Sequence, residues 1–197
     1  CRRQRIDRLR QEETVNQVLS GNSGNLWSNQ NENTQICHKL PRIERNHPGR
    51  HESRTSENCW IEHDANEIIH EVSKRFSILV QMPIRNAEQY QLVYYRKGAQ
   101  YKPHFDSFDY ETEDGKNNWE PGGQRMITVI AYLNDVEEGG ETGFPELGIN
   151  IPPKKGDAVV FHNTLLNNAA THPKINPRSL HGGMTVIKGE KGMVNLW

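Results

Sequence analysis

The feature that most constrains the fold is a series of short β-branched or aromatic runs after Pro83, separated by breaks rich in Gly, Pro or Asn. Six of these runs are predicted to be strands. They are residues 91–95, 101–106, 125–133, 156–162, 183–187 and 193–197. Because no helical pattern separates them, we expect an antiparallel arrangement rather than alternating strands and helices. A two-layered jelly roll is the closed form that protects strand edges and encloses a pocket.

The part of the chain before Pro83 is predicted to hold the helices. A helix is expected over 64–81, where Asp64 and Glu67 have the spacing of a capping box. An apolar stripe follows at helical spacing: Ile68, Ile69, Val72, Phe76 and Leu79. A weaker amphipathic helix is expected over 4–19, and 20–58 is expected to be mostly loop. The predicted fold class is mainly β with N-terminal helices, a double-stranded β-helix (jelly-roll) core with helices packed on one sheet.

Composition excludes several classes of function. Lys and Arg number 24 against 25 Asp and Glu, a net charge of −1, so no basic surplus indicates nucleic acid as a partner. No apolar run of about 18 residues indicates a membrane span in this segment. Three cysteines without a C-x-x-C motif favour neither a disulfide framework nor a zinc site. The chain begins with Cys1, so a trimmed targeting segment is compatible with it, and the endoplasmic reticulum lumen and the cytoplasm both stay open. The sequence indicates no oligomeric state.

His104 and Asp106 stand one residue apart in the expected strand 101–106. Side chains alternate along a strand, so both would point to the same face. A divalent metal would be a natural shared partner, because imidazole and carboxylate are both common ligands. The motif is short, and an ordinary surface pair is the alternative.

A metal site of this kind needs a third ligand, and His162, His172 and His181 lie downstream. His181 is favoured because it opens an expected strand and is followed by two glycines, which let a ligand approach closely. Two histidines and one carboxylate with open positions are typical of non-haem Fe(II) oxygenases. Structural zinc would require four ligands, usually including Cys.

The last expected strand has two distinct faces. Lys191, Met193, Asn195 and Trp197 share one face, which is predicted to line a pocket. Gly192, Val194 and Leu196 share the other, which is predicted to pack on the 64–81 helix. A pocket cation beside an open Fe(II) site suits a dicarboxylate cosubstrate, whose far carboxylate would pair with the ammonium. A solvated lysine is the alternative.

Four motifs in order carry a family resemblance: H-F-D, then G-G-Q-R-M-I-T-V-I-A-Y-L-N-D-V-E-E-G-G-E-T-G-F-P, then K-K-G-D-A-V-V-F, then S-L-H-G-G-M-T-V-I-K-G-E-K-G-M-V-N-L-W. Together they resemble the prolyl 4-hydroxylases, which are Fe(II)- and 2-oxoglutarate-dependent dioxygenases. The resemblance covers roughly 53–197 and is poor over 1–52, which we assign to the same domain.

The resemblance implies roles for individual residues. The iron ligands would be His104, Asp106 and His181. The 2-oxoglutarate site would comprise Lys191, Tyr95 and Thr142. Arg125 and Tyr101 would act at the reaction centre. Contacts with the peptide would come from Arg54, Ser56, Trp60, Glu88 and Trp197, with R-T-S at 54–56 as a mobile loop. Fe(II), 2-oxoglutarate and ascorbate would be the cofactors.

The implied function is hydroxylation of prolyl residues at C4 in a proline-rich peptide or protein. The alternatives are a 2-oxoglutarate oxygenase acting on another residue or a small molecule, and a non-catalytic jelly-roll binding module. The sequence departs from the family at Gly192, where a bulky residue is usual, and at Met184-Thr185, where Cys-Pro or Ala-Pro is common. The loop 107–124 is expected to be a substrate flap.

One residue does not fit a regular strand. Tyr101 lies three positions before His104, so strict alternation would turn it away from the metal. Pro103 is the residue expected to break the alternation.

Overall fold

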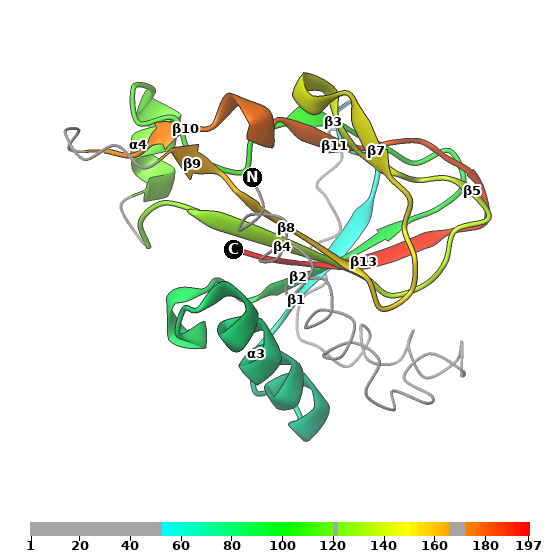
Figure 1. Ribbon diagram of the computed structural model, residues 1–197, viewed down its shortest axis with the longest axis horizontal. Helices are drawn as coiled ribbons and strands as arrows, with labels where there is room; N and C mark the ends of the chain where they lie inside the picture. The colour runs from blue at the N-terminus through cyan, green and yellow to red at the C-terminus, as the bar shows by residue number, and fades with distance from the viewer. Residues whose placement is uncertain (1–52, 120–121, 166–171) are drawn as a thin grey trace, which may run out of the picture.

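The computed structural model describes residues 53–119, 122–165 and 172–197. Two facing antiparallel sheets form the body of the protein (Figure 1). The larger sheet has the order β1 (Glu57–Ile61), β2 (Tyr90–Tyr95), β13 (Lys191–Leu196), β4 (Ile127–Tyr132), β8 (Ala158–His162). The smaller has the order β3 (Tyr101–His104), β11 (His181–Gly183), β6 (Thr142–Phe144), β7 (Ile149–Ile151). The prediction of a mainly β jelly roll is confirmed.

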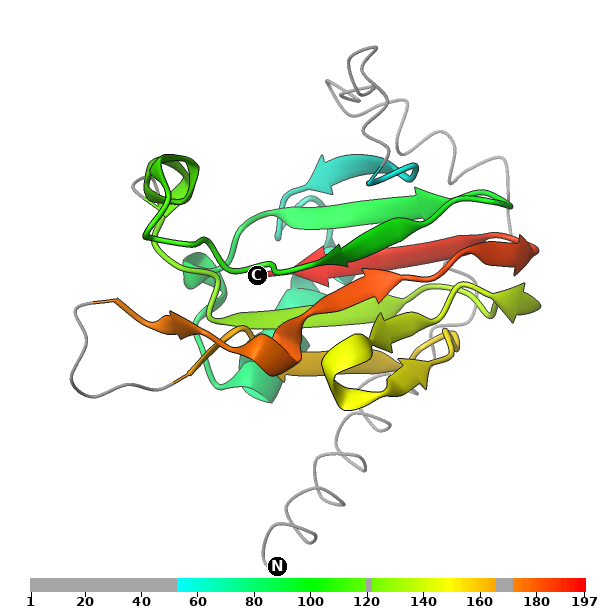
Figure 2. The same ribbon diagram turned by 90° about the horizontal axis from the view of Figure 1, so that it is seen from above.

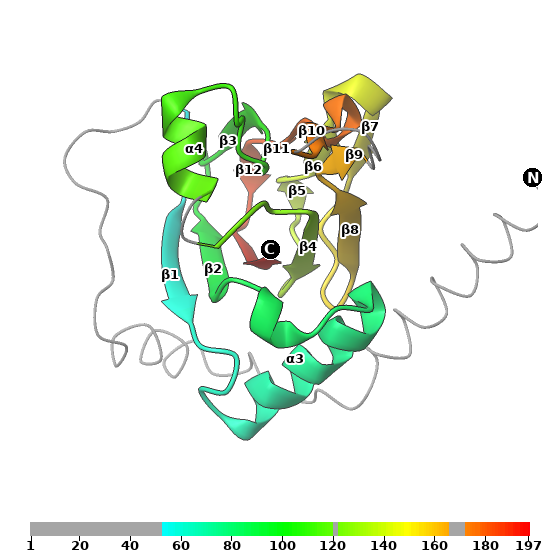
Figure 3. The same cartoon turned by 90° about the vertical axis from the view of Figure 1, so that its left-hand side faces the viewer.

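The remaining elements lie outside or at the ends of these two layers. Helix α3 (Glu67–Val80) covers the outer face of the larger sheet, as the end-on view in Figure 3 shows. Helix α4 (Glu113–Trp119) and the paired strands β9 (Thr164–Leu165) and β10 (Lys174–Ile175) lie at one end of the sheets (Figure 2). Strands β5 (Glu138–Gly139) and β12 (Val186–Lys188) pair with each other, and three 3-10 turns complete the fold: η1 (Ile84–Asn86), η2 (Pro145–Leu147) and η3 (Pro177–Ser179). Among the helices of the described ranges, none is both long and apolar enough to cross a bilayer.

The packing of α3 on the larger sheet follows the predicted pattern. Phe76 is buried against a cluster that includes Tyr90, Val129 and Leu196. The Val194 and Leu196 face of β13 therefore meets the helix, as predicted. The predicted N-cap is wrong, because the side chain of Asn66, not Asp64, accepts the hydrogen bond from the Ile69 amide at 2.9 Å.

Several element boundaries differ from expectation. The expectation of no helix between strands is wrong, because α4 lies between β3 and β4. The expected strand 101–106 ends at His104, so Asp106 follows the strand, and the expected strand 183–187 is divided between β11 and β12. Many of the remaining strands have only two or three residues, too few to show an alternating pattern. The expected helix 4–19 lies outside the described residues.

An irregular register in the smaller sheet explains why Tyr101 lies on the same side of β3 as His104. His181 pairs with His104, but Gly183 pairs with Tyr101, so two steps along β11 oppose three steps along β3. This extra residue is a β-bulge, and it contains Pro103, a residue tolerated in strands mainly at such sites. The bulge turns Tyr101 to the same side as His104, and their rings stack with centroids 3.7 Å apart.

The long connection between β3 and β4 is closed at its base by one side chain. The Gln124 amide accepts a hydrogen bond from Phe108 N at 2.8 Å and donates one to Phe108 O at 2.9 Å. The two ends of the connection are therefore held together as a strand pair would hold them. Within the connection, the Tyr110 ring stacks on His172 from the segment before β10, with centroids 3.5 Å apart.

Candidate active site

Three side chains predicted as metal ligands converge between the sheets. One ligand atom from each of His104, Asp106 and His181 lies within 4.8 Å of the others. The two oxygens of Asp106 face the two Nε2 atoms, at 3.4 Å from His104 and 3.5 Å from His181. His104 ends β3 and His181 begins β11, and the pairing of these two positions across the strands brings the imidazoles together. His162 is exposed and His172 stacks on Tyr110, so neither joins this cluster.

Backbone carbonyls orient both histidine rings. Nδ1 of His181 lies 2.8 Å from the Ser179 carbonyl oxygen, and Nδ1 of His104 lies 3.0 Å from that of Lys102. A carbonyl only accepts hydrogen bonds, so Nδ1 carries the proton in both neutral rings. Nε2 of each ring is left with a lone pair directed at the cluster, the tautomer that a metal ligand requires.

The protonation states also suit metal binding. Burial lowers the pKa of His181, which keeps the ring neutral. Burial alone would raise the pKa of Asp106, but His104, His181 and the hydroxyl of Thr128 outweigh it and hold that pKa below its usual range. Two imidazoles and one carboxylate form a donor set suited to a divalent transition metal, and none of the three is a thiolate that would select zinc.

Lys191 lies in the same cavity and is buried to 1% exposure. Among the described residues its Nζ has no hydrogen-bond partner, and burial lowers the pKa of the ammonium to about 8. The rings of Tyr95 and Tyr132 flank it, with centroids 5.2 and 5.5 Å from Nζ. A buried cation without an anion is unfavourable, so this end of the cavity is suited to receive a carboxylate.

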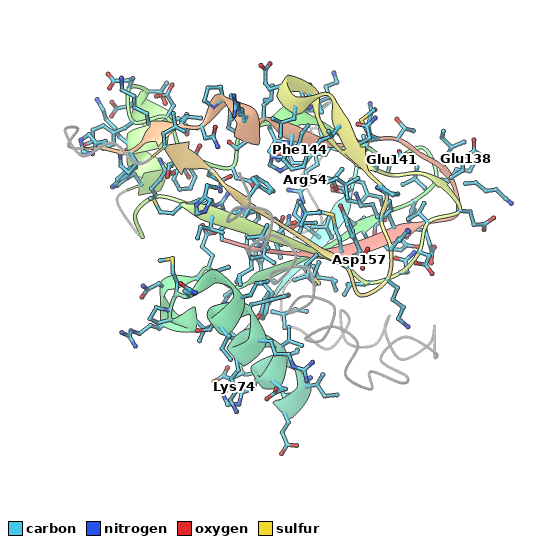
Figure 4. All side chains as sticks on the ribbon, in the orientation of Figure 1. Arg54, Lys74, Glu138, Glu141, Phe144 and Asp157 are labelled. Carbon is cyan, nitrogen blue, oxygen red and sulfur yellow. The ribbon has the colours of Figure 1, made fainter. Side chains whose placement is uncertain are left out.

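The cavity has a volume of about 250 Å³ and lies between the two sheets. Most of the residues predicted for the site line it: Arg54, Trp60, Tyr95, Tyr101, His104, Asp106, Arg125, Thr142, His181, Lys191 and Trp197. Figure 4 shows Arg54 and Phe144 between the sheets, whereas Lys74 projects from the outer side of α3. The predicted pocket face of β13 is confirmed, because Met193 and Asn195 also line the cavity.

Two of the predicted residues do not line this cavity. Ser56 is buried behind Arg54 and accepts a hydrogen bond from its Nε at 2.9 Å. The carboxylate of Glu88 accepts two hydrogen bonds from Arg125, at 2.5 Å from Nε and 2.7 Å from Nη2. The guanidinium also lies over the Trp197 ring, 3.9 Å from its centroid. Glu88 and Trp197 therefore fix the side chain of Arg125 at the rim.

Sequence reasoning missed several polar residues that support the site. Gln91 accepts hydrogen bonds from Arg54 at 3.1 Å and from Asn195 at 3.2 Å. Thr128 donates to the Asp106 carboxylate at 2.7 Å. Gln91 and Thr128 sit in strands that read as ordinary β-sequence. Only the pairing of the strands shows which neighbour each polar side chain meets.

Comparison with known proteins agrees with this geometry. The sequence model of the 2OG-Fe(II) oxygenase superfamily matches residues 90–197, more than half of the chain. The chain belongs to this superfamily. Within it, the prediction of a prolyl 4-hydroxylase relationship is confirmed. The chain is 35% identical over 163 residues to prolyl 4-hydroxylase 5 of Arabidopsis thaliana, a match covering 73% of this chain and 53% of the plant protein. It is 36% identical over 159 residues to prolyl 4-hydroxylase 1 of the same plant, with the same coverage. The chain thus spans about half the length of these relatives.

Solved structures extend the comparison. The viral collagen prolyl hydroxylase of Paramecium bursaria Chlorella virus-1, solved as a complex with 2OG, superposes with a TM-score of 0.62 at 32% identity, covering 74% of this chain and 78% of the viral chain. A Pseudomonas putida prolyl-4-hydroxylase superposes with a TM-score of 0.53 at 18% identity, covering 94% and 85%, and shows the shared fold. The His-Asp-His cluster and the buried ammonium of Lys191 fit the Fe(II) and 2-oxoglutarate of the family.

Proposed function

We propose that this chain is a peptidyl-prolyl 4-hydroxylase that uses Fe(II), O₂ and 2-oxoglutarate. One observation carries the proposal. The buried ammonium of Lys191 has no hydrogen-bond partner within the described ranges, and it lies in the same cavity as His104, Asp106 and His181. A binding module with a relic metal site would have no need for a buried cation, because burying an unpaired charge is unfavourable.

Each residue has a distinct task in this proposal. His104, Asp106 and His181 would hold the iron, and Lys191 would pair with the far carboxylate of 2-oxoglutarate. Bound iron and cosubstrate together supply the oxidising chemistry. Tyr95, Thr142 and the surrounding apolar side chains enclose the Lys191 end of the cavity, which excludes water and strengthens the ion pair.

The rim of the cavity supports a peptide substrate. Trp60 and Trp197 lie with ring centroids 6.1 Å apart, and Tyr101 stacks on a metal-site histidine. These flat surfaces suit proline rings, and Arg54 and Arg125 offer donors to peptide carbonyls. A proline-rich peptide is extended and has few N–H groups but many free carbonyls, so this rim complements it. The 107–124 segment remains a proposed flap, supported by Phe108, whose ring lies 5.0 Å from the Arg125 guanidinium.

The test is succinate release with Fe(II), O₂ and 2-oxoglutarate, combined with mass spectrometry of the peptide. The substrates compared are a proline-rich peptide, a single-proline peptide, a lysine-containing peptide and free proline. We expect one added oxygen on proline and the highest turnover with the proline-rich peptide. Oxygen on lysine or free proline, with none on the proline-rich peptide, would overturn the substrate assignment. Absence of succinate release with any substrate would favour a binding module.

Two further parts of the proposal have their own controls. Ascorbate is proposed as the rescuing reductant, so its omission should shorten the period of linear turnover. His181→Ala should abolish iron binding, whereas His162→Ala, at an exposed position, should retain it. Iron retained in His181→Ala would contradict the ligand assignment.

A further inference from the structure

A series of buried, hydrogen-bonded side chains extends from Asp106 away from the cavity. Asp106 Oδ2 accepts a hydrogen bond from Thr128 Oγ1 at 2.7 Å, and Thr128 Oγ1 accepts one from Asn163 Nδ2 at 2.7 Å. Thr128 and Asn163 both have 0% exposure. Neither is among the described residues that line the cavity.

The Asp106 carboxylate fixes the donor-to-acceptor direction of these hydrogen bonds. The Asp106 oxygen accepts a hydrogen bond from the Thr128 hydroxyl, and a threonine side chain has only this one proton to donate. The single hydroxyl proton of Thr128 is therefore committed to Asp106. The Thr128 oxygen can then only accept from its second neighbour, and Asn163 must present Nδ2 to it.

This direction leaves Asn163 Oδ1 buried without a hydrogen-bond partner in the part of the chain that the structure describes. A buried acceptor left unpaired is unfavourable, so its presence requires a reason. If the Asn163 amide were flipped, Oδ1 would face the Thr128 hydroxyl, whose proton is already donated to Asp106. The position of Asn163 is thus explained by the donor that it supplies to Thr128.

The same asparagine also connects to the second ligand. The Asn163 carbonyl accepts a hydrogen bond from Asn176 N at 2.8 Å. The Asn176 carbonyl accepts one from Ser179 Oγ at 2.7 Å, and the Ser179 carbonyl orients His181 through Nδ1. Asp106 and His181 therefore share one supporting network, whereas His104 is oriented by Lys102 within its own strand.

We propose that Thr128 and Asn163 are positioning residues that hold the Asp106 carboxylate in its metal-binding orientation. The inference rests on the metal site of the proposed function. Without the Thr128 donor, the carboxylate would be free to rotate toward one of the two imidazoles. Residues that orient a ligand in this way typically change metal affinity about 10- to 100-fold when they are removed.

The test measures Co(II) binding, with Co(II) as the probe for Fe(II), by calorimetry and by its visible absorption spectrum. Thr128→Val keeps the shape and removes the donor, so we expect about 10- to 100-fold weaker Co(II) binding and an altered spectrum. Thr128→Ser keeps the hydroxyl and should restore both. Asn163→Leu removes the second donor and should weaken binding less than Thr128→Val does.

The matched control is Thr164→Val, which removes another buried hydroxyl, one that contacts Met126 Sδ at 3.4 Å. It should lower the melting temperature without changing the Co(II) affinity. Wild-type affinity and spectrum in Thr128→Val would overturn the inference and leave the proposed function intact. No Co(II) binding by the wild type would instead overturn the metal site itself. If Thr128→Val does not fold, Thr128→Ala and Thr128→Ser give the same comparison, since they differ by the hydroxyl.

Discussion

Lys191 is held in surroundings that disfavour its own charge. Its side chain has 1% exposure, and no described residue forms a hydrogen bond with Nζ. Burial lowers its pKa from 10.5 to about 8, with Glu141 opposing the shift. An arriving carboxylate would restore the charged form. Binding and protonation should therefore be coupled at this residue.

Replacing Lys191 should affect the cosubstrate far more than the peptide. Lys191→Ala removes a charge-assisted contact in an enclosed site, a loss of roughly 1.5–3 kcal/mol. We expect the apparent KM for 2-oxoglutarate to rise about ten- to a hundredfold, with a much smaller change for the peptide. Lys188→Ala is the control, because Lys188 is exposed and pairs with Glu137 at the surface. An unchanged dependence on 2-oxoglutarate in Lys191→Ala would contradict the assignment.

The lowered pKa of Lys191 also predicts proton uptake on cosubstrate binding. Between pH 8 and 10.5 the free folded protein holds fewer protons at Lys191 than the unfolded chain does, so the free energy of unfolding rises with pH across this window. Below pH 8, burial of the charged Lys191 ammonium lowers the free energy of unfolding by its full amount. Carboxylate binding should thus take up about one proton at pH 9 and almost none at pH 6.5.

Calorimetry in buffers of different ionisation enthalpy measures this uptake directly. Lys191→Met should abolish it, because methionine has a similar length and no titrating group. Equal uptake at both pH values would show that Lys191 is not the group being charged.

Among the secondary-structure elements, the β3 bulge depends on the absence of a side chain at Gly182. A Cβ there would lie 2.8 Å from the Tyr101 carbonyl oxygen and 3.0 Å from Pro103 N, both backbone atoms. Gly182→Ala should therefore push β3 away and displace His104. We expect destabilisation of about 1–3 kcal/mol and weaker Co(II) binding.

The control for this substitution is Gly122→Ala. A Cβ at Gly122 would meet no described neighbour within 4 Å, so both stability and metal affinity should be preserved. Normal Co(II) affinity in Gly182→Ala would mean that β3 adjusts without moving His104.

The sequence predicts those parts of the fold that depend on local periodicity. Alternation along β13 correctly separates the Lys191 face from the Leu196 face, and the apolar stripe of α3 correctly identifies Phe76 as core. Pro103 correctly indicates a break in the alternation of β3, but the form of the break, a bulge, is defined only by the register against β11. The cap of α3 was misplaced by two residues, since Asp64 and Asn66 are both good capping residues and only the geometry selects one.

The residues of the candidate site likewise fall into those that the sequence predicts and those that it does not. Residues whose chemistry is evident from their type, such as His104 and Lys191, were predicted from sequence. Thr128 and Asn163 were not, because their importance comes from a partner 22 or 35 positions away in the chain. Glu88 was predicted as a peptide contact, but in the structure its carboxylate holds Arg125.

For the molecule as a whole, the site spans both sheets. His104 and His181 belong to the smaller sheet, whereas Lys191 belongs to β13 at the centre of the larger sheet. A dicarboxylate bound to the metal and to Lys191 would connect the two layers. We therefore expect 2-oxoglutarate to slow hydrogen exchange in β11 and β13 together when Co(II) is present.

This exchange experiment requires two comparisons. Co(II) alone should protect mainly the smaller sheet, and Lys191→Ala should lose the added protection of β13. Protection of β11 alone by 2-oxoglutarate would contradict a cosubstrate that reaches Lys191.

The closure of the β3–β4 connection by Gln124 has a consequence for protein engineering. The amide of Gln124 joins both ends of the connection at Phe108, so the span between these residues does not set the register of either sheet. Loops of this kind tolerate changes in length with little thermodynamic cost. If the proposed function holds, residues between Phe108 and Gln124 could therefore be exchanged or removed to change which peptide is accepted, while the metal ligands keep their scaffold.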